Sequence, residues 1–554
     1  MKKTLALFFC ILLSISVLCT SGYIFVDGNL NGIFDSGELG LNNCAVSDGV
    51  SFTFTDNKGY YSIQSNRDFI FIVKPSGYFC KNWYAENTGI KNFCLEPTVE
   101  SGIFAVVNDI HYADNADDFS QALSDRTLID NPDAYLSSFS EKINVINPDF
   151  IMCNGDMGAS VKDIDDETAM RWMKKVTNAV CTNGKNTYFS VGNHEVDKKK
   201  EDPYEIFHKA FGPEYYSFES SGIHYIVLNT HRIKNGAMIY EPDETQLEWL
   251  AMDIRLAGDK KIVVFSHEPV FDLAKDENYS KLMTLFSENI SWHITAHWHS
   301  MIKFFEKPFK ELTCGGLSGG WWEGSSPTGD PYGFTLFTVS SGELDYAYVN
   351  LTTDRSVLPY DRSVLPYDRS VLPYDRSVWF DITKKVPLDP LEHIRICVYP
   401  KITGSFSISV NRNESASSRL INNSGLWTEI CFYINTSSVS EKFGEIELTI
   451  ENQSYRKKLY FSSEPVTIKL LKDYPQFFEG CTVLLKNCLN TGQSGTVLTF
   501  NDSTDTFMVQ IKNLNLPVTV KKGGLYSLYG IYRNAETVAD PFRLFTQEGL
   551  IQEK

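Results

Sequence analysis

Short apolar runs and longer segments with helical spacing alternate through the middle of the chain. The apolar runs are IFAVV, DFIMC, TYFSV, KIVVFS and WHIT, which are typical of buried strands. Three other segments place apolar residues on one helical face, at 133–146, 167–180 and 243–257. Asp243 is a suitable N-cap for the last of them. Strands that alternate with helices predict an α/β domain, which we place at residues 101–350.

The segments on either side of this domain have a different pattern, with short alternating runs separated by glycine and asparagine. Residues 22–97 predict a small β-sandwich module. Residues 379–463 and 465–554 have similar runs and predict β-rich modules of the sandwich or barrel type. Residues 379–463 and 465–554 contain no chemical constellation that we can name, so adhesion, substrate presentation and scaffolding all stay open as their roles.

A repeated heptad separates the α/β domain from the C-terminal modules. The sequence DRSVLPY occurs three times from Asp354, and DRSV begins again at Asp375. A seven-residue period suggests a coiled coil, but each copy contains a proline, which removes a helix hydrogen bond and clashes with the preceding turn. We interpret residues 354–378 as a semi-extended linker or a row of turns, an insertion of the kind that surface loops tolerate.

The first 21 residues have the features of a secretory signal peptide. Two lysines precede an apolar run, and small residues follow it, so we expect cleavage before Gly22 and a secreted or cell-surface protein. A lipoprotein acylated at Cys19 is less favoured, because the bulky Leu18 stands where a small residue is expected. No later stretch is long and apolar enough to predict a transmembrane segment.

Charge and cysteine content narrow the set of partners. The net charge of −18 argues against a nucleic-acid backbone, because the chain has no basic surplus to displace counterions. Export permits disulfides, and the closely spaced pairs Cys80/Cys94 and Cys481/Cys488 are candidates.

Five polar patches follow the five apolar runs of the α/β domain. They contain five of the ten histidines of the chain. The patches are Asp109-Ile110-His111, Gly155-Asp156, Gly192-Asn193-His194-Glu195, Ser266-His267 and His297-Trp298-His299. Because the carboxyl ends of strands in an α/β sheet meet at one crevice, these side chains are expected to converge. Imidazole and carboxylate groups are ligands of divalent transition metals, and a two-metal site needs a bridging carboxylate.

The charge balance of this predicted centre favours an anionic substrate. Two divalent ions would bring four positive charges, whereas Asp109 and Asp156 return only two. The surplus suits an anion of the size of phosphate.

The order of these patches resembles the calcineurin-like metallophosphoesterase superfamily, over roughly residues 103–305. The resemblance implies a two-sheet α/β sandwich. The flanking β-modules and the segment GGLSGGWWEG are similar to a secreted subgroup of that superfamily.

The resemblance also implies a role for each matching position. Asp156 would bridge two divalent ions (Mn, Fe or Zn), and His194 would lie over the scissile phosphate. The implied ligands of the first metal are Asp109, His111 and His299. The implied ligands of the second metal are Asn193, His267 and His297.

Two positions depart from the family pattern. Many members have glycine before the final His-x-His, where this chain has Ala296, and one methyl group is a tolerable difference. Many also have an acidic residue that orients the catalytic histidine, where this chain has Ala159. The orienting partner of His194 is therefore left open. Purple acid phosphatases, which have glycine where His111 stands and a tyrosine ligand where Ala159 stands, are disfavoured.

The implied activity is hydrolysis of a phosphomonoester or phosphodiester. A metal-bridging hydroxide would attack phosphorus, and His194 would protonate the leaving oxygen. The expected substrate is a phosphorylated small molecule or a phosphorylated glycan or lipid headgroup. The alternative is a cell-surface binding or adhesion protein in which the centre is vestigial.

A second metal signal lies in the N-terminal module. The residues from Asp27 to Glu38 match the twelve-residue ligand spacing of an EF-hand, with Gly32 at the turn. The flanks are strand-like, so an Asn/Asp/Gly-rich hairpin loop is the alternative to calcium binding. The candidate calcium ligands are Asp27, Asn29, Asn31, Ile33, Asp35 and Glu38.

Several polar and aromatic residues in loops are expected to rim the crevice and contact substrate. They are Tyr112, Asn115, His231, Trp321, Trp322 and Tyr332. An exposed tryptophan pair offers a stacking or sugar-binding face, whereas a buried pair would anchor the loop.

Overall fold

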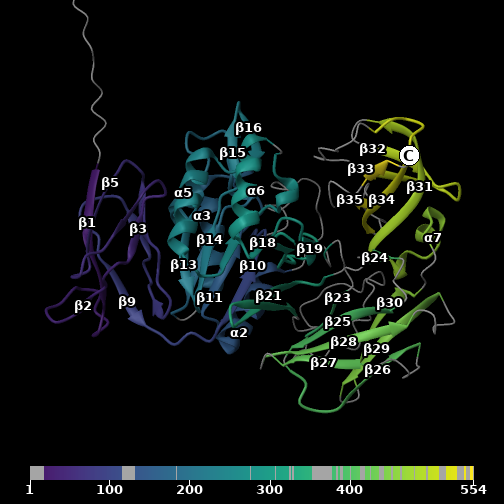
Figure 1. Ribbon diagram of the computed structural model, residues 1–554, viewed down its shortest axis with the longest axis horizontal. Helices are drawn as coiled ribbons and strands as arrows, with labels where there is room; N and C mark the ends of the chain where they lie inside the picture. The colour runs from purple at the N-terminus through teal and green to yellow at the C-terminus, as the bar shows by residue number, and fades with distance from the viewer. Residues whose placement is uncertain are drawn as a thin grey trace, which may run out of the picture.

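The structure, a computed structural model, describes most of the chain after residue 17. Up to residue 351 the gaps are 115–130, 182–183, 275, 306, 323–325 and 327–329. After it they are 352–376, 382–384, 387–390, 400, 412–417, 424–425, 436–441, 451–452, 462–464, 479–480, 495–496, 511–519, 533–541, 545–549 and 553–554. The heptad repeat falls almost entirely outside the described residues. Figure 1 shows an N-terminal module, a central domain and two C-terminal modules in chain order.

The N-terminal module consists of two small sheets. The first contains β2 (Leu39–Gly40), β1 (Leu18–Val26), β9 (Phe93–Pro97) and β7 (Tyr78–Phe79), with β5 (Tyr60–Ser65) paired to β1. The second contains β4 (Phe52–Phe54), β3 (Ala45–Ser47), β6 (Phe69–Ile72) and β8 (Tyr84–Glu86). Thr20 in β1 is buried and donates to Asn87 Oδ1 (2.6 Å). Cleavage before Gly22 would therefore cut a paired strand.

Large aromatic residues join the N-terminal module to the central domain in one hydrophobic core. The Trp83 ring lies 4.2 Å from the Tyr216 ring, centroid to centroid. Phe52 stacks on Trp249 at 6.0 Å, and the Trp249 indole N–H donates to Ser47 Oγ (3.1 Å). Because these rings would be exposed if the two parts separated, the module is part of the folded unit that holds the α/β domain.

Two sheets form the central domain. The first, in order, contains β12 (Asn186–Ser190), β11 (Phe150–Asn154), β10 (Ile103–Val107), β21 (Gly333–Ser340) and β22 (Glu343–Asn350). The second contains β13 (Tyr216–Ser220), β14 (Ile223–Val227), β17 (Ile262–Phe265), β18 (Trp292–Thr295), β20 (Lys310–Thr313) and β19 (Ile302–Phe305). Phe104 of the first sheet contacts Tyr225 and Phe265 of the second, with ring centroids 5.6 and 6.2 Å apart. The sheets therefore pack face to face, which confirms the predicted α/β sandwich.

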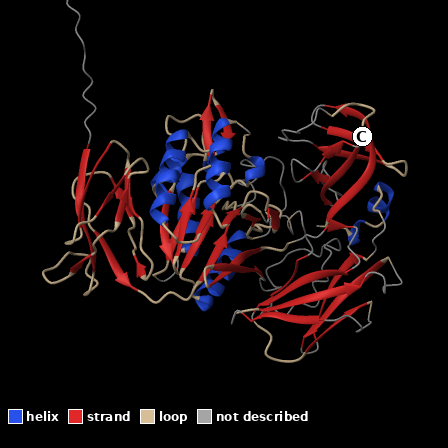
Figure 2. Cartoon of the chain, in the orientation of Figure 1, coloured by secondary structure: helices blue, strands red, loops and turns tan. Residues whose placement is uncertain are grey.

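Helices cover the outside of the sandwich, as the blue ribbons in Figure 2 show. They are α2 (Pro132–Ile146), α3 (Asp166–Val180), α4 (Glu205–Phe211), α5 (Glu244–Ala257) and α6 (Glu277–Asn289). The Asp243 side chain accepts a hydrogen bond from the Gln246 N–H, so the predicted N-cap of α5 is confirmed. A two-stranded hairpin, β15 (His231–Lys234) and β16 (Ala237–Tyr240), extends beside the second sheet.

The two C-terminal modules share a second hydrophobic core. One sheet contains β23 (Ser377–Asp381), β25 (Leu391–Tyr399), β28 (Thr428–Asn435) and β27 (Ser418–Asn423). Another contains β26 (Phe406–Val410), β29 (Phe443–Ile450) and β30 (Gln453–Tyr460). After α7 (Ile468–Asp473), the last sheet contains β33 (Thr506–Gln510), β32 (Val497–Asn501), β31 (Thr482–Ser494), β34 (Leu525–Tyr532) and β35 (Phe542–Leu544), with β24 (Lys385–Val386) and β36 (Leu550–Gln552) at its sides.

A partly buried arginine links these modules to the central domain. Arg395 of β25 contacts Asp345 of β22 (2.8 Å) and Glu429 of β28 (2.7 Å). Its guanidinium also lies 4.7 Å from the centroid of the Tyr346 ring. Two carboxylates and an aromatic face thus compensate one partly buried charge.

Two further sequence expectations concern cysteines and membranes. Cys488 lies in β31 and Cys481 directly precedes its first residue, and the pairing with β34 places the two roughly 20 Å apart at about 3.3 Å per residue. A disulfide needs Cα atoms within about 7 Å, so this pair cannot form one. Among the described residues, no helix is long and apolar enough to cross a membrane.

A buried ion pair between β14 of the second sheet and helix α5 predicts a pH-dependent stability. His224 Nε2 lies 2.8 Å from Asp253 Oδ2. Burial lowers the pKa of His224, but Asp253 and Glu219 raise it more, to about 9. Because the folded pKa exceeds the unfolded value of about 6.5, the stabilisation is complete below pH ~6.5 and is lost as pH rises through 9. The contribution is on the order of 3 kcal/mol. Thermal melting of the wild type and of Asp253→Asn should therefore differ most below pH 7, and a constant difference up to pH 10 would contradict the assignment.

Candidate metal centre

The five polar patches lie directly after strands β10, β11, β12, β17 and β18, and their side chains meet. Five of the predicted metal ligands have left-handed backbone conformations, with φ between 45° and 69°. They are Asp109, His111, Asp156, His297 and His299. Such conformations cost about 1–3 kcal/mol each in residues other than glycine, and they cluster at functional sites. The loops therefore hold these side chains in place at the expense of backbone strain.

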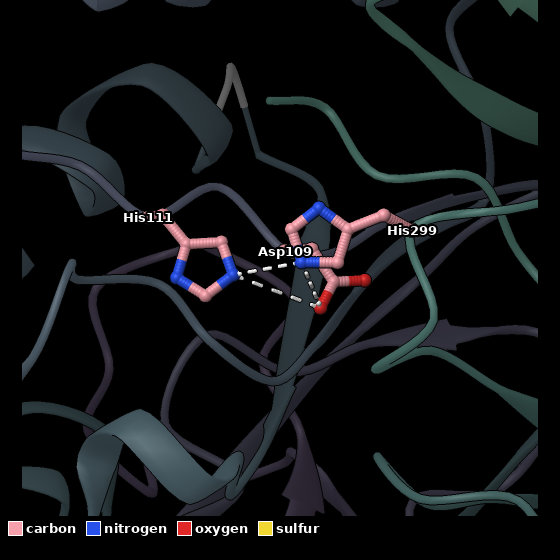
Figure 3. Close-up of side chains that lie close together, drawn as sticks. All are labelled: Asp109, His111 and His299. Atoms are coloured by element: carbon pink, nitrogen blue, oxygen red, sulfur yellow. Dashed lines mark hydrogen bonds and ion pairs between the residues drawn. The ribbon is translucent and has the colours of Figure 1, made fainter. Parts of the chain in front are cut away.

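The first ligand group contains Asp109, His111 and His299. The two imidazole Nε2 atoms are 3.1 Å apart. Asp109 Oδ1 lies 3.9 Å from His111 Nε2 and 3.5 Å from His299 Nε2. Figure 3 shows both rings turned toward the Asp109 carboxylate. All three residues are buried.

The second ligand group contains Asp156, His267 and His297. Asn193 joins it, because its Oδ1 lies 3.0 Å from His297 Nδ1. Asp156 Oδ2 lies 3.1 Å from His267 Nε2 and 3.6 Å from His111 Nε2. One carboxylate oxygen thus faces both ligand groups, which is the position of a bridging ligand.

Hydrogen bonds fix the imidazoles in the form that binds metal. The Nδ1–H of His267 donates to the Asn154 carbonyl (2.8 Å), and the Nδ1–H of His299 donates to the Gly319 carbonyl (2.7 Å). Their Nε2 atoms are left for the centre. Asp109 Oδ1 is buried and accepts no hydrogen bond from any residue that the structure describes. The closely spaced imidazole nitrogens and the Asp109 carboxylate oxygen could bind divalent cations. Imidazole and carboxylate donors suit Mn, Fe or Zn.

The electrostatics agree with this assignment. Burial lowers the pKa of His297 to about 4 and that of His299 to about 3, and it holds the pKa of His111 well below its usual value. These imidazoles are therefore neutral near pH 7 and able to bind metal. At His267, burial also lowers the pKa, but Asp156 opposes it and the net pKa is well above the usual value. A metal ion would replace that proton.

The orienting partner of His194 is a backbone group. Its Nδ1 donates to the carbonyl oxygen of Ala159, the residue that stands where an acidic side chain was expected. The backbone N–H of His194 donates to Asp156 Oδ1 (2.9 Å). The His194 ring also meets the His111 ring edge-on, with centroids 4.7 Å apart. Burial lowers the pKa of His194.

Glu195, to which the sequence interpretation gave no role, joins two of the ligand loops. Its carboxylate accepts hydrogen bonds from the N–H groups of Asp156 and Met157 (2.8 Å each) and Gly192 (2.9 Å). At Gly192, an added Cβ would lie 2.2 Å from Asp156 Oδ1, so only glycine fits there. Glu195 and Gly192 therefore set the position of the bridging carboxylate.

The two adjacent tryptophans have different environments. The Trp322 indole N–H donates to the Ile110 carbonyl (2.9 Å), and its buried ring anchors the loop. Trp321 is half-buried and stacks on His111, with centroids 4.0 Å apart. It also lies 4.9 Å from the His299 ring and 5.3 Å from the His194 ring. Trp321 therefore borders the metal centre.

Three of the other predicted substrate residues are buried and do not lie on an exposed rim. Tyr112 is buried and donates to Asp133 Oδ1 (3.1 Å). Tyr332 is buried, with its ring 4.5 Å from the Tyr135 ring. Asn115 lies outside the described residues. His231 is buried, and its Nε2 donates to Glu268 Oε1 (2.6 Å).

The loop from Asp27 to Glu38 is ordered by its own polar groups. Asp27 Oδ2 accepts from the Gly32 N–H (2.7 Å). Asp35 Oδ2 accepts from the side-chain amides of Asn29 and Asn31 (2.8 Å each). These hydrogen bonds lower the pKa of Asp35, which keeps it ionised. The predicted calcium ligands thus lie together, and calcium binding stays a prediction.

Comparisons with known proteins agree with this geometry. Residues 103–301 match the family model described as Calcineurin-like phosphoesterase, and residues 28–93 match N terminal of Calcineurin-like phosphoesterase. The chain therefore carries a calcineurin-like phosphoesterase domain together with the N-terminal companion domain of that family. A search of curated proteins gave no match.

Solved structures similar to the chain include a dimetal phosphatase from Danio rerio, with 14% identity over 45% of this chain and 96% of that one and a TM-score of 0.34. Another is a putative 5'-nucleotidase from Staphylococcus aureus, with 16% identity over 47% of this chain and 56% of that one and a TM-score of 0.30. A third is an archaeal phosphodiesterase, with 11% identity over 45% of this chain and 99% of that one and a TM-score of 0.23.

Proposed function

We propose that this protein is an exported, metal-dependent phosphoesterase that hydrolyses a phosphorylated small molecule or a phosphorylated glycan or lipid headgroup. The observation that carries the proposal is that Asp156 Oδ2 lies between the two ligand groups, 3.6 Å from His111 Nε2 and 3.1 Å from His267 Nε2. When bound, the two metal ions supply an activated water and neutralise charge on the phosphate. The complete ligand set disfavours the alternative of a binding protein with a vestigial centre.

The protein's own residues orient the reaction. Asp156 is fixed by Glu195, and His194 by the Ala159 carbonyl. Because the Nδ1–H of His194 is engaged there, the proton for the leaving oxygen would be carried at Nε2 of the protonated imidazole, a form that the negative charge of a bound phosphate favours. This arrangement serves monoesters and diesters alike.

A substrate panel tests the proposal. Purified protein loaded with Mn²⁺, Fe²⁺ or Zn²⁺ would be assayed with phosphomonoesters, phosphodiesters and nucleotides, each with and without a chelator. Chelator-sensitive hydrolysis of at least one class is the expected result, and none on any class would contradict the proposal. Amino-terminal sequencing of protein recovered from the medium or cell surface tests export, and an intact Met1 would contradict it.

We further propose that Trp321 contacts the leaving group, because its ring lies beside both His111 and His194. Trp321→Ala should lower kcat/KM for a nucleoside 5'-monophosphate roughly threefold to tenfold, since an aromatic contact contributes about 0.5–1.5 kcal/mol. Ribose 5-phosphate has the same kind of leaving oxygen without the base and should lose less. Trp321→Phe keeps a ring and serves as the control. Equal losses on both substrates would show that the ring is only structural.

We also propose that the loop from Asp27 to Glu38 binds calcium. If the affinity is in the extracellular range, with Kd of about 10⁻⁴–10⁻³ M, then ~10 mM Ca²⁺ should stabilise the module by about 1.4–2.7 kcal/mol. The rise in melting temperature should disappear in Asp35→Ala. It should persist in Asp56→Asn, which changes another turn of the same module. A wild type that melts identically with calcium and with chelator would exclude the site.

A further inference from the structure

A second buried histidine–carboxylate pair lies behind the second ligand group. Glu268, directly after His267, is fully buried, and its carboxylate accepts hydrogen bonds from His231 Nε2 (2.6 Å) and from the Thr230 hydroxyl. His231 is itself held, because its backbone N–H donates to Asn229 Oδ1 (2.9 Å). The carboxylate is therefore held in a fixed position by its neighbours.

This carboxylate faces a metal ligand. Glu268 Oε1 lies 4.0 Å from His297 Nδ1, the nitrogen that approaches Asn193 Oδ1 at 3.0 Å. The ring of His231 lies 6.3 Å from the ring of His267, centroid to centroid. Glu268 does not belong to the ligand groups found among the described residues, so it stands one layer behind them.

We propose that Glu268, oriented by His231, is a positioning residue that holds the metal ion of the second ligand group. The inference rests on the proposed function for the presence of that ion. The negative charge of the buried Glu268 carboxylate, close to the ligand His297, attracts a cation bound by that ligand. The attraction is strong because little solvent screens it. Residues one layer behind the ligands typically change metal affinity by 10–100-fold. The pair gives His231 this role in place of the substrate contact expected from the sequence.

The chain offers a matched pair for comparison. His224 of β14 and Asp253 of α5 are also buried and hydrogen-bonded at 2.8 Å, but they belong to none of the ligand groups among the described residues. If buried carboxylates acted here only on folding, Asp253→Asn and Glu268→Gln would have similar effects. If Glu268 holds a metal ion, the two variants separate in metal affinity.

Calorimetric titration of metal-free full-length protein with Mn²⁺ tests the proposal without measuring activity. The wild type should take up two ions. Glu268→Gln should bind one ion with native affinity and the other 10–100-fold more weakly, whereas Asp253→Asn should bind both normally. Without metal, Glu268→Gln should melt close to the wild type. On addition of Mn²⁺, its melting temperature should rise less than that of the wild type. Second-ion affinity within twofold of the wild type would overturn the proposal.

A second variant tests the proposal even if Glu268→Gln does not fold. His231→Ala leaves the carboxylate but removes its anchor, and it should weaken the same ion by a smaller factor. Native second-ion affinity in His231→Ala would overturn the orienting role. If the wild type binds two ions and hydrolyses no ester, the proposed function fails while the titration still tests Glu268. If hydrolysis is normal and Glu268→Gln binds both ions normally, only the present inference fails.

Discussion

Asp156→Asn is expected to lose bound metal and phosphoesterase activity together. Asp156 Oδ2 faces His111 of one ligand group and His267 of the other, so a neutral amide would remove the charge that both ions share. Metal ions contribute several kcal/mol to stabilising the transition state, and about 1.36 kcal/mol corresponds to tenfold in rate. The loss should therefore be on the order of 10²–10³-fold or more. Elemental analysis and an aryl-phosphate assay on the same sample would measure both quantities.

The control for this variant is Asp166→Asn, an Asp whose half-exposed side chain pairs with Lys200 on the surface. Such surface pairs contribute little to stability, so the control should keep both its metal and its rate. An Asp156→Asn protein with two ions bound and normal turnover would show that Asp156 is not the bridging ligand.

His194→Ala is expected to keep both metal ions but to lose rate in proportion to the basicity of the leaving group. A poor leaving group needs the proton most, and general acid catalysis contributes roughly 10²–10⁴-fold. An alkyl phosphate should therefore lose nearly that factor. A nitrophenyl phosphate should lose much less, because nitrophenolate leaves well without a proton.

Two other outcomes would assign His194 differently. Its ring nitrogen lies within 4.8 Å of the ligand atoms of His111 and Asp156, so loss of an ion in the variant would make it a ligand. Equal losses on the alkyl and the nitrophenyl substrate would favour charge stabilisation over proton transfer. Metal content and a leaving-group series on the same preparation separate the three roles.

The sequence predicted the family, the α/β sandwich and the convergence of the patches because these depend on local patterns. Each patch follows an apolar run, and the ends of neighbouring strands meet whatever the details of the loops. The family models and the two packed sheets confirm this part. The hydrolytic activity, export and calcium binding stay predictions.

Contacts between distant residues were beyond the sequence pattern. The Ala159 carbonyl orients His194. Every residue has a backbone carbonyl, so the sequence does not indicate which one accepts this hydrogen bond. Trp321 and Trp322 are adjacent and identical, yet one borders the centre and the other anchors the loop. In the sequence, nothing distinguishes Glu268 from any other glutamate. Its role becomes visible only when the fold places His231 beside it.

The hydrophobic pattern also could not show whether residues 22–97 fold separately or pack on the central domain. The alternating runs of residues 22–97 predict a separate sandwich, whereas Trp83 and Phe52 pack against Tyr216 and Trp249 of the central domain. Alternation identifies the buried face of a strand, but it does not identify which part of the chain covers that face.

Metal analysis of the purified full-length protein, combined with turnover of an aryl phosphate before and after chelation, tests the central claim most directly. We predict two divalent ions per chain, hydrolysis that stops when they are removed, and recovery when Mn²⁺ or Zn²⁺ is restored. A protein that retains two ions and hydrolyses no phosphate ester, or one that hydrolyses esters equally well without metal, would contradict the assignment of a dinuclear phosphoesterase centre.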